Sequence, residues 1–259
     1  MRQPTLFLSH GAPTFLLEES ATTRFWQSLP ARLPATPRAV LCVSAHWDAA
    51  QPSISGTLGK VGIQHDFYGF PRELYDITWD EHEDASTSAW LRQRLGELQV
   101  EVTEENRPLD HGVWVPLKTA WPKPDFPVYQ LSLCLAQGLD SHWIQGQKLQ
   151  ALRDDGVLII GSGGITHNLR ALEWNAAEES AAPWAAAFVE AVEQAIASNN
   201  RDALCQPWQL PFGRECHPTI EHYAPLLLVM GAATGEPVKA LHRSWQYGNF
   251  ALNAYGAGL

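Results

Sequence analysis

Short apolar runs alternate with longer helix-like stretches along most of this chain. Four runs have the length and the Val, Ile, Leu and Phe content of buried strands: Thr5–Ser9, 39–44, Val128–Leu133 and 157–161. Four stretches are typical of helices: 85–98, 141–153, 181–198 and 221–231. Strands that alternate with helices predict an α/β fold with a central, mostly parallel sheet that is covered by helices on both faces.

No domain linker or internal repeat interrupts this alternation. The chain has 259 residues, a common length for one large α/β unit, so we expect a single domain over residues 1–259. The segments 47–80 and 199–218 are rich in Pro, Trp and Gly and are expected to be long loops. We predict no helix or strand in 199–218.

The net negative charge of the chain argues against some classes of partner. Lys+Arg 18 against Asp+Glu 28 gives a formal net charge of −10, and such a surface repels phosphate backbones and anionic lipids. We therefore expect no nucleic-acid partner and no membrane. No signal-peptide-like apolar segment follows Met1, which predicts a cytoplasmic protein. Cys42 and Cys134 lie in apolar runs and are expected to be buried, reduced thiols. The oligomeric state is left open.

Three of the ten histidines come at or just after the ends of predicted strands: His10 in S-H-G-A-P, His46 in S-A-H-W-D and His167 in G-S-G-G-I-T-H-N-L-R. Ligands of open α/β sheets bind outside the carboxyl ends of the strands, so these imidazoles are expected around one crevice. Neutral imidazole is a common ligand of zinc and iron. The pattern therefore predicts a site for one divalent metal ion.

Two further histidines stand in dense local motifs. His111 follows Asp110, which could orient it or raise its basicity. Glu221 and His222 open the predicted helix 221–231, and either of them could complete the metal shell.

The other histidines receive weaker assignments. His65, in H-D-F-Y-G-F-P, is expected on a lid, whereas His82, His142 and His242 have polar neighbours and are predicted at the surface.

Other chemistries are less well supported. The strings G-S-G-G and G-A-A-T-G-E match no phosphate-binding loop, and no serine has the context of a nucleophile elbow. The same histidines would serve a zinc-dependent hydrolase that attacks an amide or ester with activated water. They would also serve a metal-holding binding protein without turnover. An interaction protein without metal would require all the histidine placements to be accidental.

Six motifs follow one another in the order L-F-L-S-H-G-A-P, V-S-A-H-W, H-D-F-Y-G-F-P, D-H-G-V-W-V-P-L, I-T-H-N-L-R and P-T-I-E-H-Y-A-P-L-L. Together they resemble the class III extradiol ring-cleavage dioxygenases, and in particular the DOPA 4,5-dioxygenase branch. The similarity runs from about residue 6 to about residue 231. It implies an enzyme that inserts O₂ into the ring of a catechol-type, DOPA-like substrate and releases a ring-opened semialdehyde.

The resemblance also implies roles for individual residues. His10 and His46 match the first two metal-ligand histidines of the family, and His222 matches a metal-ligand histidine of the DOPA branch. His167 matches the acid–base histidine at the open side of the metal, which is also a ligand in zinc-bound members. His111 matches a second active-site histidine near the substrate.

The identity of the metal is left open at this stage. Extradiol cleavage normally uses two histidines and one carboxylate on Fe(II), whereas an all-histidine shell also suits Zn(II). One divalent ion, Fe(II) or Zn(II), is therefore expected, with Glu221 or His222 as the third ligand. His167 would accept the catechol proton, and His111 would hydrogen-bond the developing oxygen anion. Trp47 and Trp114 would either stack on the substrate ring or belong to the core.

Overall fold

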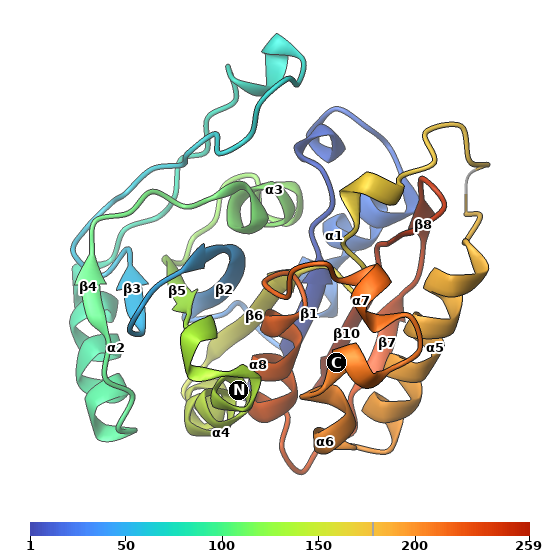
Figure 1. The fold of residues 1–259 in the computed structure, drawn as a ribbon. Helices are drawn as coiled ribbons and strands as arrows, with labels where there is room; N and C mark the ends of the chain where they lie inside the picture. Colours follow the sequence, from blue (N-terminus) through green and yellow to red (C-terminus); the bar gives the residue numbers. More distant parts are fainter. Residues whose placement is uncertain (178) are drawn as a thin grey trace.

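The computed structural model describes residues 1–177 and 179–259 and is built around one eight-stranded sheet (Figure 1). Its strand order is β4-β3-β5-β2-β6-β1-β10-β7. The four central strands run parallel to one another: β5 (Val128–Leu133), β2 (Ala39–Asp48), β6 (Val157–Gly163) and β1 (Thr5–Ser9). The predicted single-domain α/β fold with a mostly parallel sheet is therefore confirmed.

Short strands that were not predicted complete both edges of the sheet. On one side lie β3 (Ser53–Ser55) and β4 (Thr103–Glu105), and on the other lie β10 (Ala254–Ala257) and β7 (Lys239–His242). The strands β3, β10 and β7 each pair antiparallel with a neighbour, and a separate hairpin contains β8 (Trp245–Gln246) and β9 (Phe250–Ala251). These strands have two to four residues, too few to produce a recognisable apolar pattern.

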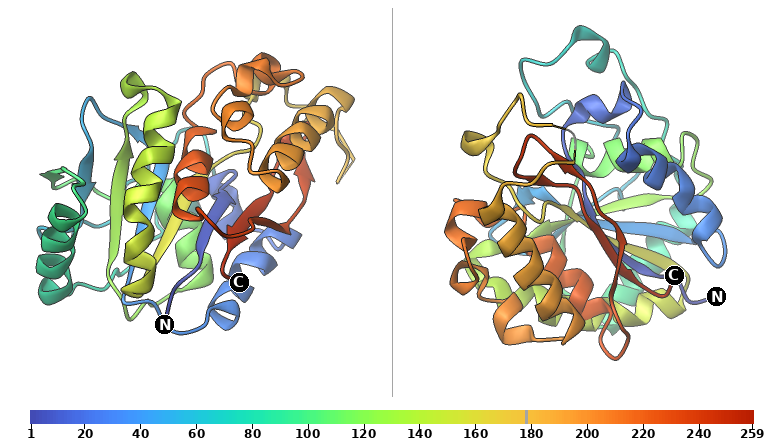
Figure 2. Two further views of the ribbon diagram at one scale, coloured as in Figure 1. Left: turned by 90° about the horizontal axis from the view of Figure 1, so that it is seen from below. Right: turned by 90° about the vertical axis from the view of Figure 1, so that its right-hand side faces the viewer.

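Helices cover both faces of the sheet (Figure 2). The alternation along β1 shows why: Leu6 and Leu8 pack with Trp26 and Trp114 on one face, while Phe7 packs with Phe188 on the other. The first face is covered by α1 (Ala21–Arg32) and α3 (His111–Ala120), and the other by α4 (Leu139–Asp154), α5 (Pro183–Ala197) and α8 (Ala224–Ala232). The helix α2 (Ala85–Glu97) packs its Leu91 and Leu95 against the β3–β5 side of the sheet.

The predicted helix 221–231 begins later than expected. Residues 221–223 form a turn, and α8 starts at Ala224 with Pro225 in its first turn. Proline is favoured there because the first N–H groups of a helix have no intrahelical partner. Glu221 and His222 are therefore turn residues rather than helix residues.

Two expected loops contain short elements. The segment 199–218 holds α6 (Arg201–Leu204), the 3-10 helix η5 (Pro207–Gln209) and α7 (Gly213–Cys216), so the prediction of no element there was wrong. The segment 47–80 contains β3 and the 3-10 helix η2 (Arg72–Leu74), and it extends over α3 at the top of Figure 1. Three more single-turn 3-10 helices are η1 (Pro13–Leu16), η3 (Leu135–Gln137) and η4 (Leu169–Ala171). Elements of one turn are too short to show a helical period.

No helix in the described ranges 1–177 and 179–259 has the length and apolar character needed to cross a bilayer.

Candidate metal centre and active-site cavity

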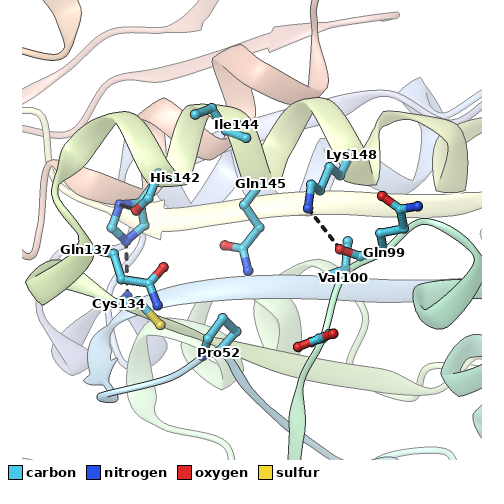
Figure 3. A pocket seen from close by; sticks show the side chains of 11 residues that line it. Pro52, Gln99, Val100, Cys134, Gln137, His142, Ile144, Gln145 and Lys148 are labelled. Carbon is cyan, nitrogen blue, oxygen red and sulfur yellow. Dashed lines mark hydrogen bonds between the residues drawn. The ribbon is translucent and has the colours of Figure 1, made fainter.

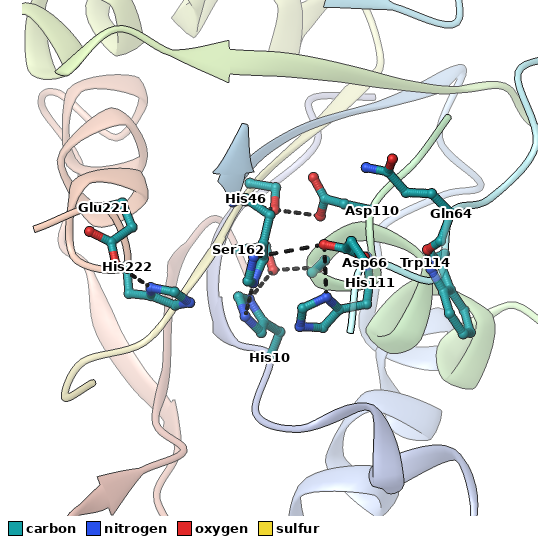
Figure 4. A network of polar contacts seen from close by, with 12 residues as sticks. His10, His46, Gln64, Asp66, Asp110, His111, Trp114, Ser162, Glu221 and His222 are labelled. Atoms are coloured by element: carbon teal, nitrogen blue, oxygen red, sulfur yellow. Dashed lines mark hydrogen bonds and ion pairs between the residues drawn. The ribbon is translucent and has the colours of Figure 1, made fainter. Parts of the chain in front are cut away.

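Five histidines from distant parts of the chain gather at the carboxyl ends of the central strands. Figure 4 shows four of them, His10, His46, His111 and His222. His10 follows β1, His46 lies near the end of β2, His111 begins α3, His167 follows β6 and His222 precedes α8. The ring centroid of His10 lies 4.9 Å from that of His46 and 5.4 Å from those of His111 and His222. Because β1 and β2 both pair with β6, their ends meet at one edge of the sheet.

His10, His46 and His222 each offer a ring nitrogen, and these atoms lie within 4.8 Å of one another. Nε2 of His46 is 3.0 Å from Nε2 of His10. Two nitrogens that bind one ion at about 2.1 Å would lie about 3.0 to 3.4 Å apart, depending on the bond angle, so the observed separation is compatible with a shared ion. Nε2 of His222 is buried and has no hydrogen-bond partner within the described part of the chain. The donor set therefore fits one divalent ion.

Neighbouring polar groups place the ring protons of His10 and His222 on Nδ1, away from the point where the Nε2 atoms converge. The Ser162 hydroxyl donates to the Gly112 carbonyl, so its oxygen accepts from Nδ1 of His10 at 3.0 Å. Nδ1 of His222 lies 3.1 Å from Oε1 of Glu221, a carboxylate that can only accept. Both rings thus keep Nε2 as the lone-pair nitrogen, which is how metal-binding histidines are commonly oriented.

The same contact separates the two candidates for the third ligand. Oε1 of Glu221 accepts from both the His222 ring and the Thr219 hydroxyl. The residue whose ligand atom converges with those of His10 and His46 is His222, not Glu221. Because both residues lie in a turn, Glu221 can bond the ring of its own neighbour, His222.

Asp66 is a site residue that the sequence analysis missed. Its Oδ2 lies 3.0 Å from Nδ1 of His111 and 3.8 Å from Nδ1 of His46, and its Oδ1 accepts from the backbone N–H of His111 at 2.9 Å. Burial raises the pKa of Asp66, but the contacts with His111 outweigh it and leave that pKa below the usual value. The motif H-D-F-Y-G-F-P contains this residue, and within it Asp66 rather than His65 reaches the histidine cluster.

Asp110 was expected to orient His111, and His65 was expected on a lid. The Asp110 carboxylate is fully buried and accepts from the Ser44 hydroxyl at 2.7 Å and from the Gln130 amide, so it does not orient the His111 ring. His65 donates through Nε2 to the Ile77 carbonyl at 3.1 Å and is not among the residues that line the cavity. Neighbouring residues at the start of a helix point in different directions, and this explains why Asp110 and His111 separate.

Burial keeps four imidazoles of the site neutral, those of His10, His46, His167 and His222. It lowers the pKa of His46 to about 3, with His111 as the next cause, and the pKa of His167 to about 4, with His217 as the next cause. Burial also lowers the pKa of His10 and His222 well below the usual value, assisted by the neighbouring imidazoles. A histidine must be neutral to offer its lone pair to a cation, so the site is ready to bind one at neutral pH.

Close backbone packing holds the histidines in place. A Cβ atom on Gly112 would lie 2.6 Å from Oγ of Ser44 and 3.1 Å from Nδ1 of His10, and one on Gly163 would lie 2.1 Å from the His222 carbonyl oxygen. Only glycine allows these approaches, because any other residue would push the rings or the strand ends apart.

His167 takes a different position from the three converging nitrogens. Its ring is stacked on that of His222, with centroids 3.3 Å apart and planes 7° apart, and its backbone N–H donates to the Cys216 carbonyl at 2.9 Å. It is not in the group formed by His10, His46 and His222, but it lines the cavity in front of them. This position suits a group that acts on a bound molecule.

The histidines form the floor of a cavity of about 430 Å³. Its walls are aromatic and aliphatic: Pro13, Phe67, Phe70, Leu169, Leu172, Trp174, Tyr247 and Phe250. Trp47 and Trp114 are not part of this wall. Trp114 is fully buried and donates through Nε1 to the Gln64 carbonyl at 2.9 Å, while Trp47 is buried beneath the Arg107 guanidinium. Both belong to the core, which was one of the two predicted alternatives.

A larger pocket of about 750 Å³ lies away from the histidine cluster, beside α4 (Figure 3). His142 lines it, and the prediction that His142 lies at the surface was wrong. Its Nε2 accepts from the backbone N–H of Cys134 at 3.2 Å and its Nδ1 donates to the Gly138 carbonyl at 3.2 Å. Both ring nitrogens of His142 are thus used by the backbone and are not free to bind a ligand in this pocket.

The remaining predictions concern the exposure of two histidines and the burial of the cysteines, and one of them was wrong. His242 was wrongly predicted at the surface, because it is half-buried and stacked on Phe25, whereas His82 is exposed as expected. Cys42 and Cys134 are buried free thiols, as predicted, and so are the other two cysteines, Cys205 and Cys216.

Comparison with known proteins places this site in a family. Residues 4–256 match the family described as the catalytic LigB subunit of aromatic ring-opening dioxygenase. The chain is 39% identical to a 4,5-DOPA dioxygenase extradiol of Escherichia coli K12 over 245 residues, which cover 92% of this chain and 88% of that protein. It is 36% identical to a protein of the same name from Beta vulgaris, with 97% and 95% covered.

A solved structure is similar over the whole fold. The crystal structure of an uncharacterized protein from Escherichia coli K12 has a TM-score of 0.82 and 31% identity, and the match covers 99% of this chain and 100% of that one. The family match spans every element that carries a site histidine. The chain therefore belongs to the family of the catalytic LigB subunit of aromatic ring-opening dioxygenase, and it is an oxidoreductase of the extradiol dioxygenase class.

Proposed function

We propose that this enzyme holds one divalent ion on His10, His46 and His222 and opens the ring of a catechol-type substrate with O₂, releasing a semialdehyde. The observation that carries the proposal is the meeting of three imidazole nitrogens within 4.8 Å of one another at the floor of an aromatic cavity. The names of the relatives make DOPA the reference substrate for testing.

Fe(II) is the ion that we propose for activity. When bound, it would bring the catechol oxygens and O₂ together and carry electron density from the ring to O₂. Zn(II) suits the same donors but has no redox chemistry, so a zinc-loaded protein should bind catechols without opening them. The contact of Glu221 with His222 supports a three-histidine shell in which the carboxylate orients the third ligand.

His167 is the proposed acid–base group. Its neutral imidazole lines the cavity beside His222, where it can accept the proton that a catechol hydroxyl loses on binding. The pKa of about 4 applies to the ring without ligands, where burial disfavours the cation. A substrate oxygen anion beside the ring would favour the protonated form, and His167 could then return the proton.

His111 is the proposed hydrogen-bond donor to the oxygen of the reacting group. Asp66 lies beside its Nδ1, and the ring borders the cavity, so the opposite nitrogen is left for the substrate. His111 would thus stabilise negative charge that develops as the ring opens.

Four buried free cysteines suit a reducing compartment, and we propose the cytoplasm as the location of the enzyme. Catechol and O₂ are the proposed partners. The acidic charge of the chain supports the expectation of no nucleic-acid or membrane partner.

Reconstitution with single metals tests the proposal. Metal-free protein is loaded anaerobically with Fe(II) or with Zn(II), and O₂ consumption and the yellow ring-opened product are measured with catechol and with DOPA. We expect turnover with Fe(II) alone. Hydrolysis of an ester or amide by the Zn(II) form would favour the hydrolase alternative, and catechol binding without product in both forms would favour a non-catalytic binding protein.

A further inference from the structure

The walls of the cavity differ in character from its floor. Apart from the histidines, the lining residues in the described part of the chain are aromatic, aliphatic or small, and among them Thr14 and Tyr247 carry hydroxyl groups. No Lys, Arg, Asp or Glu is among the lining residues within the described ranges of the chain. The part of a substrate that projects from the metal centre therefore meets apolar surface.

Two of these apolar side chains are uncovered in the free protein. Trp174 is 70% exposed and Leu169 is 58% exposed, although both border the cavity. Large apolar groups that stay exposed at the mouth of a pocket are typical of surfaces that a ligand covers.

This wall has a defined shape. The Trp174 ring packs on the Tyr247 ring with centroids 4.9 Å apart, and the backbone N–H of Glu173 donates to the Tyr247 carbonyl at 3.0 Å. The segment after η4 is thus tied to the β8–β9 hairpin, so the two sides of the mouth are held together.

A charged substituent would find no counter-charge inside the cavity. Burying a carboxylate or an ammonium group without a partner is strongly unfavourable, whereas burying an alkyl or aryl group is favourable. Arg170 lies next to Leu169 in the sequence, but it is exposed and is not a lining residue. The net charge of −10 adds a further repulsion for anionic substrates.

From these observations we infer that the enzyme takes a catechol whose ring substituent is uncharged and apolar, in preference to the zwitterionic side chain of DOPA. The inference rests on the proposed function, because it concerns the same site. It assigns Trp174 and Leu169 as the residues that contact the substituent.

Three catechols with the same three-carbon substituent length test the inference: 4-propylcatechol, 3-(3,4-dihydroxyphenyl)propanoate and DOPA. Calorimetric titration of the Zn(II)-loaded protein measures binding without turnover. We expect 4-propylcatechol to bind at least about tenfold tighter than either charged compound. Equal or tighter binding of DOPA or of the propanoate would overturn the inference.

Turnover of the Fe(II) form separates this inference from the proposed function. Ring opening in which kcat/KM is highest for DOPA would overturn the inference and leave the proposed function standing. Absence of ring opening for all three compounds, with the predicted order of binding preserved, would remove the proposed function and keep the apolar recognition.

Single substitutions locate the contact. Trp174→Ala and Leu169→Ala should each weaken binding of 4-propylcatechol by about fivefold, and weaken binding of unsubstituted catechol by a smaller factor. Leu58→Ala is the matched control, because Leu58 is also 58% exposed but lies outside the cavity. Unchanged 4-propylcatechol binding in both wall variants would contradict the assignment.

Arg170→Gln tests whether the neighbouring guanidinium reaches the substrate. We expect the binding of DOPA and of the propanoate to stay the same in this variant. A weakening of about tenfold, confined to the charged compounds, would show that Arg170 pairs with their carboxylate and would overturn the inference.

Discussion

Asp66 faces both the backbone and the ring of His111: Oδ1 accepts from the backbone N–H at 2.9 Å, and Oδ2 lies 3.0 Å from Nδ1. One carboxylate therefore holds the backbone of His111 and places a negative charge beside its ring. The same Oδ2 lies 3.8 Å from Nδ1 of His46, so Asp66 also faces a proposed metal ligand.

Asp66→Asn should lower kcat by about 10- to 100-fold while the protein stays folded. The asparagine oxygen can still accept from the His111 backbone, but an NH₂ group in place of Oδ2 removes the negative charge that lies 3.0 Å from Nδ1. The His111 ring would then lose its orientation, and the pH profile of kcat should change. Asp125→Asn, which alters an exposed carboxylate, is the control. A wild-type pH profile and kcat in Asp66→Asn would rule out the positioning role.

Glu221 and His222 should behave differently when each is replaced. His222→Ala removes one of three converging nitrogens, and we expect stoichiometric metal to be lost, as measured by elemental analysis after gel filtration. Glu221→Gln keeps an oxygen near Nδ1 of His222, and its metal affinity should fall by about 10- to 100-fold without loss of the site. Loss of metal in Glu221→Gln with retention in His222→Ala would assign the third ligand to the carboxylate.

His167→Phe should keep the metal and lose catalysis. Phenylalanine preserves a flat ring against His222 but cannot accept a proton, so kcat should fall by about 10²- to 10⁴-fold. Metal content and the affinity for 4-propylcatechol, measured on the Zn(II) form, report whether the cavity is intact. Undiminished turnover in a metal-loaded variant would refute the acid–base role.

The metal-free protein should lose stability as the pH falls from about 6.5 to about 4. Burial lowers the pKa of His217 from about 6.5 in the unfolded chain to about 4 in the folded protein. Between pH 6.5 and pH 4, His217 is therefore protonated in the unfolded chain and neutral in the folded protein. Stability is therefore fully present above pH 6.5 and declines below it, by roughly 3 kcal/mol at most for this residue.

Chemical denaturation of the metal-free protein at pH 7, 5.5 and 4.5 measures this decline. Nε2 of His217 donates to the Ile165 carbonyl at 2.7 Å, a bond that a glutamine amide can imitate without titrating. The slope of stability against pH should therefore be shallower in His217→Gln. An identical slope in both proteins would show that His217 does not contribute.

The central strands of the fold were predictable because each one is marked by a continuous apolar run within a few residues of sequence. β1 and β5 have the predicted bounds, since each is a continuous buried run followed by small or polar residues. β2 and β6 extend four and two residues past their predicted ends at 44 and 161, and these extensions carry His46 and Ser162. The edge strands and one-turn helices escaped prediction, because two to four residues show no period.

By itself the sequence determined that His10, His46 and His167 lie at or just after strand ends. It also determined that they converge, because the carboxyl ends of parallel strands lie at one edge of the sheet whatever the path of the connecting segments. Only the tertiary structure decided which side chain supports each imidazole. Asp66 rather than Asp110 lies against His111, Glu221 orients His222, and Trp174 rather than Trp47 or Trp114 lines the cavity. The physical reason is that a strand end follows from local periodicity, whereas the direction of a side chain depends on the packing of segments far apart in the sequence.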